Sequence, residues 1–171
     1  MNKQSDYINR LCKSLVRKHG TNDPFELAEA LGVHVEFDNI GAVKGYYCYM
    51  NRIRMIAINR ELNNRFRRFV CGHELGHDLL NRNRAIFSPL KDIGFTSTAR
   101  HEVEANSFAA SLLVREDEFL ELASCGYTDE QISAALGIHV ELVRIKSNLL
   151  RQSGIQLRIQ EMPTYDFLGI L

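Results

Sequence analysis

Tryptophan is absent from this chain, proline occurs three times, and 21 acidic side chains cancel the 21 basic ones. A net charge of zero gives no overall electrostatic reason to expect binding to nucleic acid or to a membrane surface. No apolar run approaches the roughly 20 residues of a membrane-spanning helix. The first residues, MNKQSDYINR, lack the apolar core of a signal peptide. We therefore expect a cytoplasmic protein with no membrane partner.

Cysteine is also scarce, with four residues scattered along the chain. They lack the paired spacing of a disulfide framework, so we expect reduced thiols that mostly fill the core. Cys71 precedes His73 by two residues and would lie on a different helix face, so it is not counted as a metal ligand. With 45% hydrophobic and 25% charged residues, the composition suits one globular domain, or one domain with a small appendage.

The stretch His73-Glu74-Leu75-Gly76-His77 is the strongest chemical signal in the sequence. On a helix, two histidines four residues apart share one face, with about 6 Å between their Cβ atoms, and can hold one Zn²⁺. Glu74 then has the place of the general base in the H-E-x-x-H pattern of zinc hydrolases. The alternative is a buried helix with two hydrogen-bonded histidines and a surface glutamate.

A catalytic zinc ion needs a third protein ligand, which must come from elsewhere in the chain. The extended pattern with a third histidine would require Gly and His where the chain has Leu80 and Asn83, so that class is excluded. A predicted helix over residues 99–114 offers two glutamates instead. At 100° per residue, Glu102 lies about 60° from the centre of the apolar stripe and Glu104 about 100°. We expect Glu102 to be the ligand and keep Glu104 as the weaker candidate.

Several polar residues are candidates for supporting roles. Asn106, one turn after Glu102, can hydrogen-bond a ligand histidine or Glu102 itself. His101 can contact substrate or cap its helix. The remaining candidates for an oxyanion donor are the tyrosines Tyr46, Tyr47 and Tyr49, which the sequence cannot rank.

Hydrophobic periodicity and capping residues predict the elements around these residues. We expect helices over 3–18 and 24–31, strands over 33–37, 46–50 and 53–58 with a turn at 51–52, a long helix capped by Asn59, an irregular connection over 81–98, and a helix over 99–114 capped by Thr98. The resulting class is α+β.

The region after residue 115 reads as helix, glycine-containing turn and helix, which is typical of a helix-turn-helix. Its second helix is only mildly basic, so we favour a helical buttress over a DNA reader, with partner docking as a further alternative. We divide the chain into a peptidase-like domain (1–117), this helical module (118–154) and a tail (155–171). The apolar end of the tail needs a cover, for which a second copy of the chain is one candidate.

Taken together, these motifs resemble the ImmA/IrrE-type zinc metallopeptidases. The matching stretches are Asp23-Pro24-Phe25, Ile56-Ala57-Ile58-Asn59, Arg68-Phe69-Val70 with HELGH, and residues 102–113. The resemblance covers roughly residues 20–115. It implies a small gluzincin-like fold, in which a short sheet packs on the HExxH helix and on the third-ligand helix. In that family an ExxAN element supplies the glutamate ligand, which corresponds to Glu102.

Two functions follow as hypotheses. The first is a cytoplasmic zinc endopeptidase of narrow specificity, in which His73, His77 and Glu102 hold Zn²⁺ and Glu74 is the base. The resemblance implies a protein substrate, namely a repressor-type DNA-binding protein of a phage or mobile element, and hence a role in transcription regulation. Narrow specificity or an activator protein would restrain such an enzyme. The second is a metal-dependent regulator or sensor with little catalysis, acting through its helical module or a docked partner.

Overall fold

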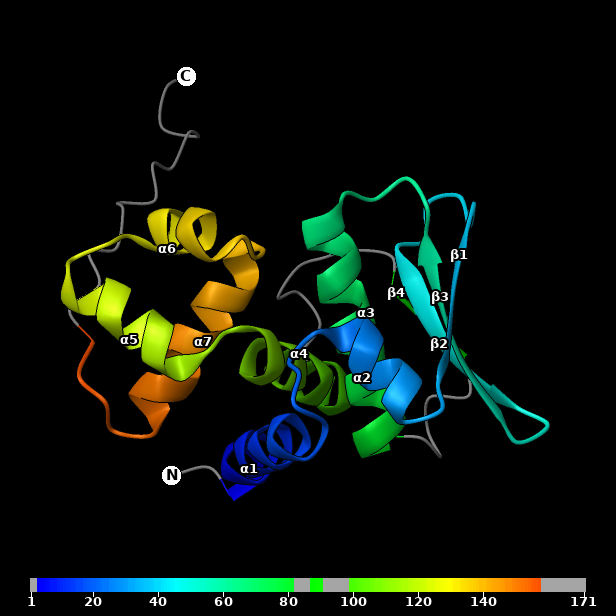
Figure 1. Ribbon diagram of the computed structural model, residues 1–171, viewed down its shortest axis with the longest axis horizontal. Helices are drawn as coiled ribbons and strands as arrows, with labels where there is room; N and C mark the ends of the chain where they lie inside the picture. The colour runs from blue at the N-terminus through cyan, green and yellow to red at the C-terminus, as the bar shows by residue number, and fades with distance from the viewer. Residues whose placement is uncertain (1–2, 82–86, 91–98, 158–171) are drawn as a thin grey trace.

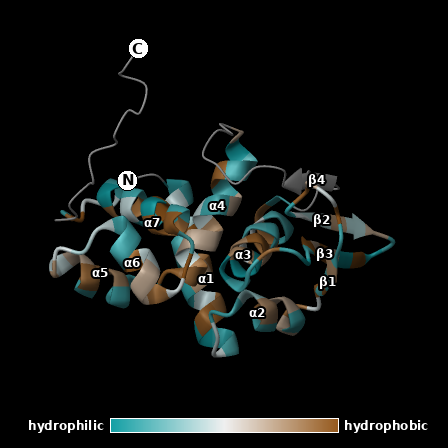
Figure 2. Cartoon of the chain, turned by 90° about the horizontal axis from the view of Figure 1, so that it is seen from above, coloured by the Kyte–Doolittle hydropathy of each residue, from teal (hydrophilic) through white to brown (hydrophobic). Residues whose placement is uncertain are grey.

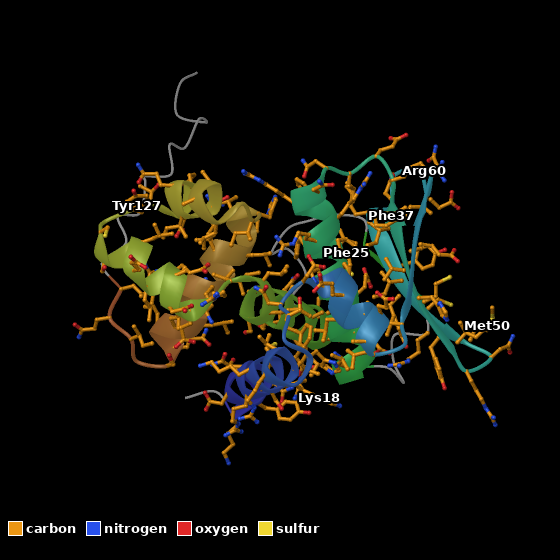
Figure 3. All side chains as sticks on the ribbon, in the orientation of Figure 1. Lys18, Phe25, Phe37, Met50, Arg60 and Tyr127 are labelled. Atoms are coloured by element: carbon orange, nitrogen blue, oxygen red, sulfur yellow. The ribbon has the colours of Figure 1, made fainter. Side chains whose placement is uncertain are left out.

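The computed structural model describes residues 3–81, 87–90 and 99–157, and its four strands form one sheet in the order β1-β3-β2-β4. β1 (His34–Asp38) pairs parallel with β3 (Ile53–Asn59), and β2 (Gly45–Met50) pairs antiparallel with β3. Asn51 and Arg52 have φ values of 52° and 67°. Two adjacent positive φ values are typical of the tight turn that matches the twist of a hairpin. Met50 marks the exposed end of this hairpin (Figure 3).

The fourth strand corrects the sequence analysis, which predicted an irregular connection over 81–98. β4 (Phe87–Leu90) pairs antiparallel with β2 at the edge of the sheet. An edge strand needs hydrogen bonds on one side only and therefore tolerates Pro89. A proline in a four-residue segment argues against a strand when only the sequence is considered, which explains the error.

Four helices precede or flank the sheet; α2 and α3 pack against its strands, and α1 and α4 pack against the other helices (Figure 1). They are α1 (Lys3–His19), α2 (Pro24–Ala30), α3 (Asn64–Asn81) and α4 (Arg100–Leu113). α3 contacts both β2 and β3 on one side and α4 on the other. Figure 2 shows α3 between the strands and α4. This arrangement confirms the expected α+β fold, with the short sheet packed on α3 and with α4 packed on the other side of α3.

The starts of these helices show how local polar residues select a boundary. Asp23 caps α2 as expected, because its side chain accepts hydrogen bonds from the backbone of Phe25 and Glu26. The cap expected for α3 was wrong. Asn63 Oδ1 accepts from Phe66 N at 3.1 Å, whereas the Asn59 amide donates to two loop carbonyls. Both asparagines precede the same amphipathic run, so the sequence alone did not distinguish them.

The cap expected for α4 does not stand either. α4 begins at Arg100 with Ala99 at its N-cap, and Ala99 makes no side-chain capping bond. Thr98 lies outside the described residues.

The two long helices approach each other closely at Gly76. A Cβ atom on Gly76 would lie 2.9 Å from Ala105 Cα and 3.1 Å from Ala105 O. Cβ atoms essentially never lie within 3.0 Å of another heavy atom in this way, so the absence of a Cβ on Gly76 is what lets the α3 backbone approach α4. The close approach brings the motif on α3 within reach of the side chains on α4.

The C-terminal part consists of α5 (Glu116–Ser124), α6 (Asp129–Leu136) and α7 (Val140–Gln152). Thr128 and Gln131 form a reciprocal capping box at the start of α6, and Gly137, with φ 64°, ends it. α7 contacts α4, and a continuous hydrophobic cluster contains residues of both. None of the helices in the described residues is both long and apolar enough to cross a membrane. The apolar tail considered for a dimer contact, residues 162–171, lies outside the described part.

Candidate metal centre

The centre is built on consecutive turns of α3. His73 and His77 are each 1% exposed, and their Nε2 atoms lie 3.0 Å apart. Their four-residue spacing places both rings on the same side of the helix, which here faces α4. Two buried imidazole nitrogens thus meet between α3 and α4.

Glu102 joins them from the first turn of α4. Its Oε2 lies 3.3 Å from His73 Nε2, and its Oε1 lies 3.4 Å from His77 Nε2. Hydrogen bonding to His73 and His77 lowers the pKa of Glu102 well below its usual range, against the opposing effect of its partial burial. The carboxylate is therefore ionised at neutral pH and can act as a ligand.

The geometry of these three residues fits a divalent cation. Asn106 Oδ1 lies 2.8 Å from His73 Nδ1. A carbonyl oxygen only accepts, so Nδ1 carries the proton and the Nε2 lone pair of His73 points toward the other donors. In a tetrahedral zinc site with bonds of about 2.0–2.1 Å, neighbouring ligand atoms lie about 3.4 Å apart. The observed separations of 3.0–3.4 Å agree with that spacing.

Glu74 lies in the same pocket but contributes nothing to this triangle. It is fully buried, and apart from the backbone N–H of Tyr47, which lowers its pKa, its carboxylate has no hydrogen-bond partner among the described residues. Burial raises the pKa of Glu74 to about 8, with His77 lowering it and Glu102 raising it by smaller amounts. An unpaired buried carboxylate costs free energy, and such groups concentrate at functional sites.

Gly45 lets the start of β2 pack closely on α3 beside Glu74, a role that the sequence analysis did not anticipate. A Cβ atom on Gly45 would lie 2.3 Å from Val70 Cγ1 and 3.8 Å from Glu74 Oε1. A glycine at the start of a strand is a weak sequence signal of such close packing.

Asp78 and its partners are a further group that sequence reasoning missed. Asp78 is buried and accepts a hydrogen bond from the hydroxyl of Tyr47 at 2.8 Å and from Arg54 at 3.0 Å. Arg54 also donates to the carbonyl of Leu31. These bonds tie the residue that follows His77 to the sheet and to the end of α2.

The tyrosines expected as oxyanion donors are placed elsewhere. The Tyr47 hydroxyl is committed to Asp78. Tyr46 alternates with Tyr47 along β2 and so points to the opposite face of the sheet from α3. Tyr49 packs against the hydrophobic core. Of the predicted candidates, His101 is the one near the centre, with Nε2 3.3 Å from Glu102 Oε1 and its side chain 41% exposed.

The weaker ligand candidate, Glu104, is engaged away from the histidines. It is 7% exposed, and its carboxylate accepts hydrogen bonds from Arg100 at 2.7 Å and from Asn81 at 3.4 Å. The only metal-compatible group among the described residues consists of His73, His77 and Glu102.

Aromatic rings connect the centre to the C-terminal helices. The ring of Phe69 lies edge-on to His73, with centroids 6.2 Å apart, and stacks on His139 at 5.7 Å. His139 is the N-cap residue of α7 and also contacts Phe66 at 4.4 Å. The wall behind His73 therefore includes a residue from the C-terminal helices.

Comparison with known proteins places this geometry in a family. Residues 28–148 match Peptidase_M78, described as the IrrE N-terminal-like domain. The chain is 34% identical over 140 residues to "Uncharacterized immunity region protein 2" of Bacillus phage phi105, covering 81% of the chain and 88% of that protein. It is 24% identical over 135 residues to "Metallopeptidase ImmA" of Bacillus subtilis strain 168, covering 77% and 78%. Because the match spans most of the sequence, the chain belongs to the Peptidase_M78 family of IrrE N-terminal-like domains.

Proposed function

We propose that this protein is a zinc-dependent endopeptidase. The observation that carries the proposal is the juxtaposition of three converging ligand atoms with the buried carboxylate of Glu74, which lies on the helix of the two histidines and has no side-chain hydrogen-bond partner among the described residues. A purely structural zinc site closes its fourth position with a protein ligand and has no need for Glu74. Membership of a peptidase family and similarity to a protein named as a metallopeptidase support the assignment.

The proposed mechanism gives each residue a role. His73, His77 and Glu102 would hold the zinc ion, which lowers the pKa of a water molecule and polarises the peptide carbonyl. Asn106 fixes the tautomer and ring orientation of His73 through the Nδ1 hydrogen bond.

Glu74 would move the proton. Its carboxylate takes a proton as water attacks the carbonyl carbon and then delivers it to the leaving amine. In the metal-free protein burial raises the pKa of Glu74 to about 8, which brings its proton exchange near neutral pH, and the positive charge of a bound metal ion would favour the ionised form that accepts the proton. His101, partly exposed at the edge of the centre, is the nearest candidate to donate to the substrate carbonyl.

For the substrate we propose a repressor-type DNA-binding protein of a phage or mobile element, cleaved in the cytoplasm with narrow specificity. The support is the similarity to a protein from a phage immunity region and to ImmA. An activator protein would account for restraint of the enzyme between cleavage events.

Glu74→Gln is the test of this function. The variant should retain zinc and lower the cleavage rate by roughly 10²–10⁴-fold, because the amide cannot accept the proton. Mass spectrometry of cells that express either form would identify fragments present only with the unaltered protein. Glu36→Gln, the same change at an exposed position on β1, is the matched control and should cleave normally. Equal cleavage by Glu74→Gln would refute the mechanism.

A further inference from the structure

A second site lies apart from the metal centre, where α1, the α4–α5 junction and α7 meet. The chain there forms a cavity of about 810 Å³ that is open to solvent on one side. None of His73, His77 and Glu102 lines it. Pockets that hold small organic ligands usually measure about 300–1,000 Å³, so the cavity has the size of a ligand site.

The most unusual residue in the cavity wall is Lys146. It is 3% exposed, and its Nζ lies 3.4 Å from Glu116 Oε2. Lys13 Nζ reaches the same oxygen at 3.4 Å from α1. One carboxylate therefore serves two ammonium groups and leaves a positive charge uncompensated. Lysine is rarely buried to this extent without full pairing, because desolvation of the charge is costly.

The other residues that line the cavity indicate which kind of ligand it could bind. The charged side chains are Lys13, Arg17, Arg115 and Lys146 against Glu116 and Asp117, a formal excess of two positive charges. Val16, Leu112 and Leu120 supply apolar wall. An inorganic anion would satisfy the charge but leave this apolar surface unfilled.

We propose that this cavity binds a small organic anion with an apolar body. The anionic head lies against Lys146 and Lys13, and the body lies against Val16, Leu112 and Leu120. The site goes beyond the proposed peptidase activity. Its occupant would touch the last turn of α4 together with α5 and α7, and α4 carries Glu102 in its first turn.

The proposal can be tested with the fluorescent anion 8-anilinonaphthalene-1-sulfonate on the full-length protein. We expect saturable binding at one site, with displacement by octanoate. Lys146→Met should weaken this binding roughly tenfold or more, because a charge-assisted hydrogen bond is lost. Replacing a buried charge with an apolar side chain is compatible with folding, and Glu116 keeps Lys13 as its partner.

Two further variants make the result unambiguous. Lys13→Met changes a side chain that is 63% exposed, so it tests the same head-group contact even if Lys146→Met fails to fold. Lys18→Met is the matched control, since Lys18 lies on the same helix, is exposed (Figure 3) and does not line the cavity. Unchanged affinity in Lys13→Met and in folded Lys146→Met would overturn the proposal, as would failure of octanoate to displace the probe.

Discussion

At the scale of single residues, the orientation of His73 depends on one hydrogen bond to a side chain on another helix. Replacing Asn106 with alanine removes the acceptor for Nδ1–H, so the ring can rotate or change tautomer. We expect zinc affinity to fall by about 10–100-fold. Competition with a chromophoric chelator would measure it. Asn106→Asp keeps an acceptor and should bind zinc more tightly than the alanine variant; equal affinities in the two variants would contradict this role.

The buried carboxylate of Glu74 predicts a pH-dependent stability of the metal-free protein. The carboxyl loses its proton near 4.5 in the unfolded chain but only at about 8 in the folded one. Between these values the unfolded chain is ionised while the folded protein keeps its proton, so stability falls as pH rises. The Glu74→Gln variant has no titrating group at this position, so its free energy of unfolding does not fall for this reason.

Urea unfolding in the presence of a chelator would measure the effect. The Glu74→Gln variant should be about as stable as the unaltered protein near pH 4.5 and clearly more stable at pH 8 and above. Glu36→Gln, at an exposed site, should show no such divergence. A constant difference across this range would contradict the assigned pKa.

At the scale of elements, the packing of α3 on α4 predicts that alanine is more destabilising at Gly76 than at Gly72. Alanine at position 76 would press on the Ala105 backbone at 2.9 Å, which cannot move without separating the helices. We expect a loss of about 1–3 kcal/mol in the free energy of unfolding. Alanine at position 72 meets Leu113 Cδ1 at 3.3 Å, the movable end of a side chain.

Gly72→Ala is therefore the matched control. It should be nearly neutral, because the gain in helix propensity of about 1 kcal/mol offsets a small rearrangement. Urea denaturation midpoints of the two variants would compare them. Equal midpoints would show that the close approach at Gly76 is not what limits helix packing.

Local signals made many of the elements predictable from sequence. Asp23 and Thr128 select helix starts through their own side chains, and Asn51 favours the two-residue turn because asparagine tolerates a positive φ. β4 could not be predicted in this way, because its pairing with β2 is made through the backbone, and β2 lies more than 35 residues earlier in the sequence.

In the candidate site, too, helical spacing predicted some residues, whereas contacts between separate elements could not be predicted. Helical phase alone directs attention to Glu102 rather than Glu104, and the structure places Glu102 beside both histidines. The bonds of Asp78 to Tyr47 and Arg54 join separate elements, as does the stacking of His139 on Phe69. The spacing of apolar residues along the sequence does not predict contacts between separate elements, so these contacts could be found only from the structure.

At the scale of the whole molecule, charge distribution predicts no DNA binding by the C-terminal helices. The chain has no net charge, and Arg144 on α7 forms ion pairs with Asp129, Glu130 and Glu141. Because three carboxylates neutralise its charge, the Arg144 guanidinium would attract a phosphate backbone only weakly. Fluorescence anisotropy with a labelled duplex at about 50 mM salt should show no binding. Binding that weakens steeply with salt would instead support the regulator hypothesis.

The bonds around Asp78 also bear on protein design. The pentapeptide HELGH is not a portable module, because the next residue anchors the helix to Tyr47 on β2, to Arg54 on β3 and, through Arg54, to the end of α2. A graft of the pentapeptide alone onto another helical scaffold would lack the anchor that Asp78 provides, and a graft extended to Asp78 would bury its carboxylate without these partners. The smallest unit that could be transplanted intact is the α2–β2–β3–α3 assembly together with the first two turns of α4.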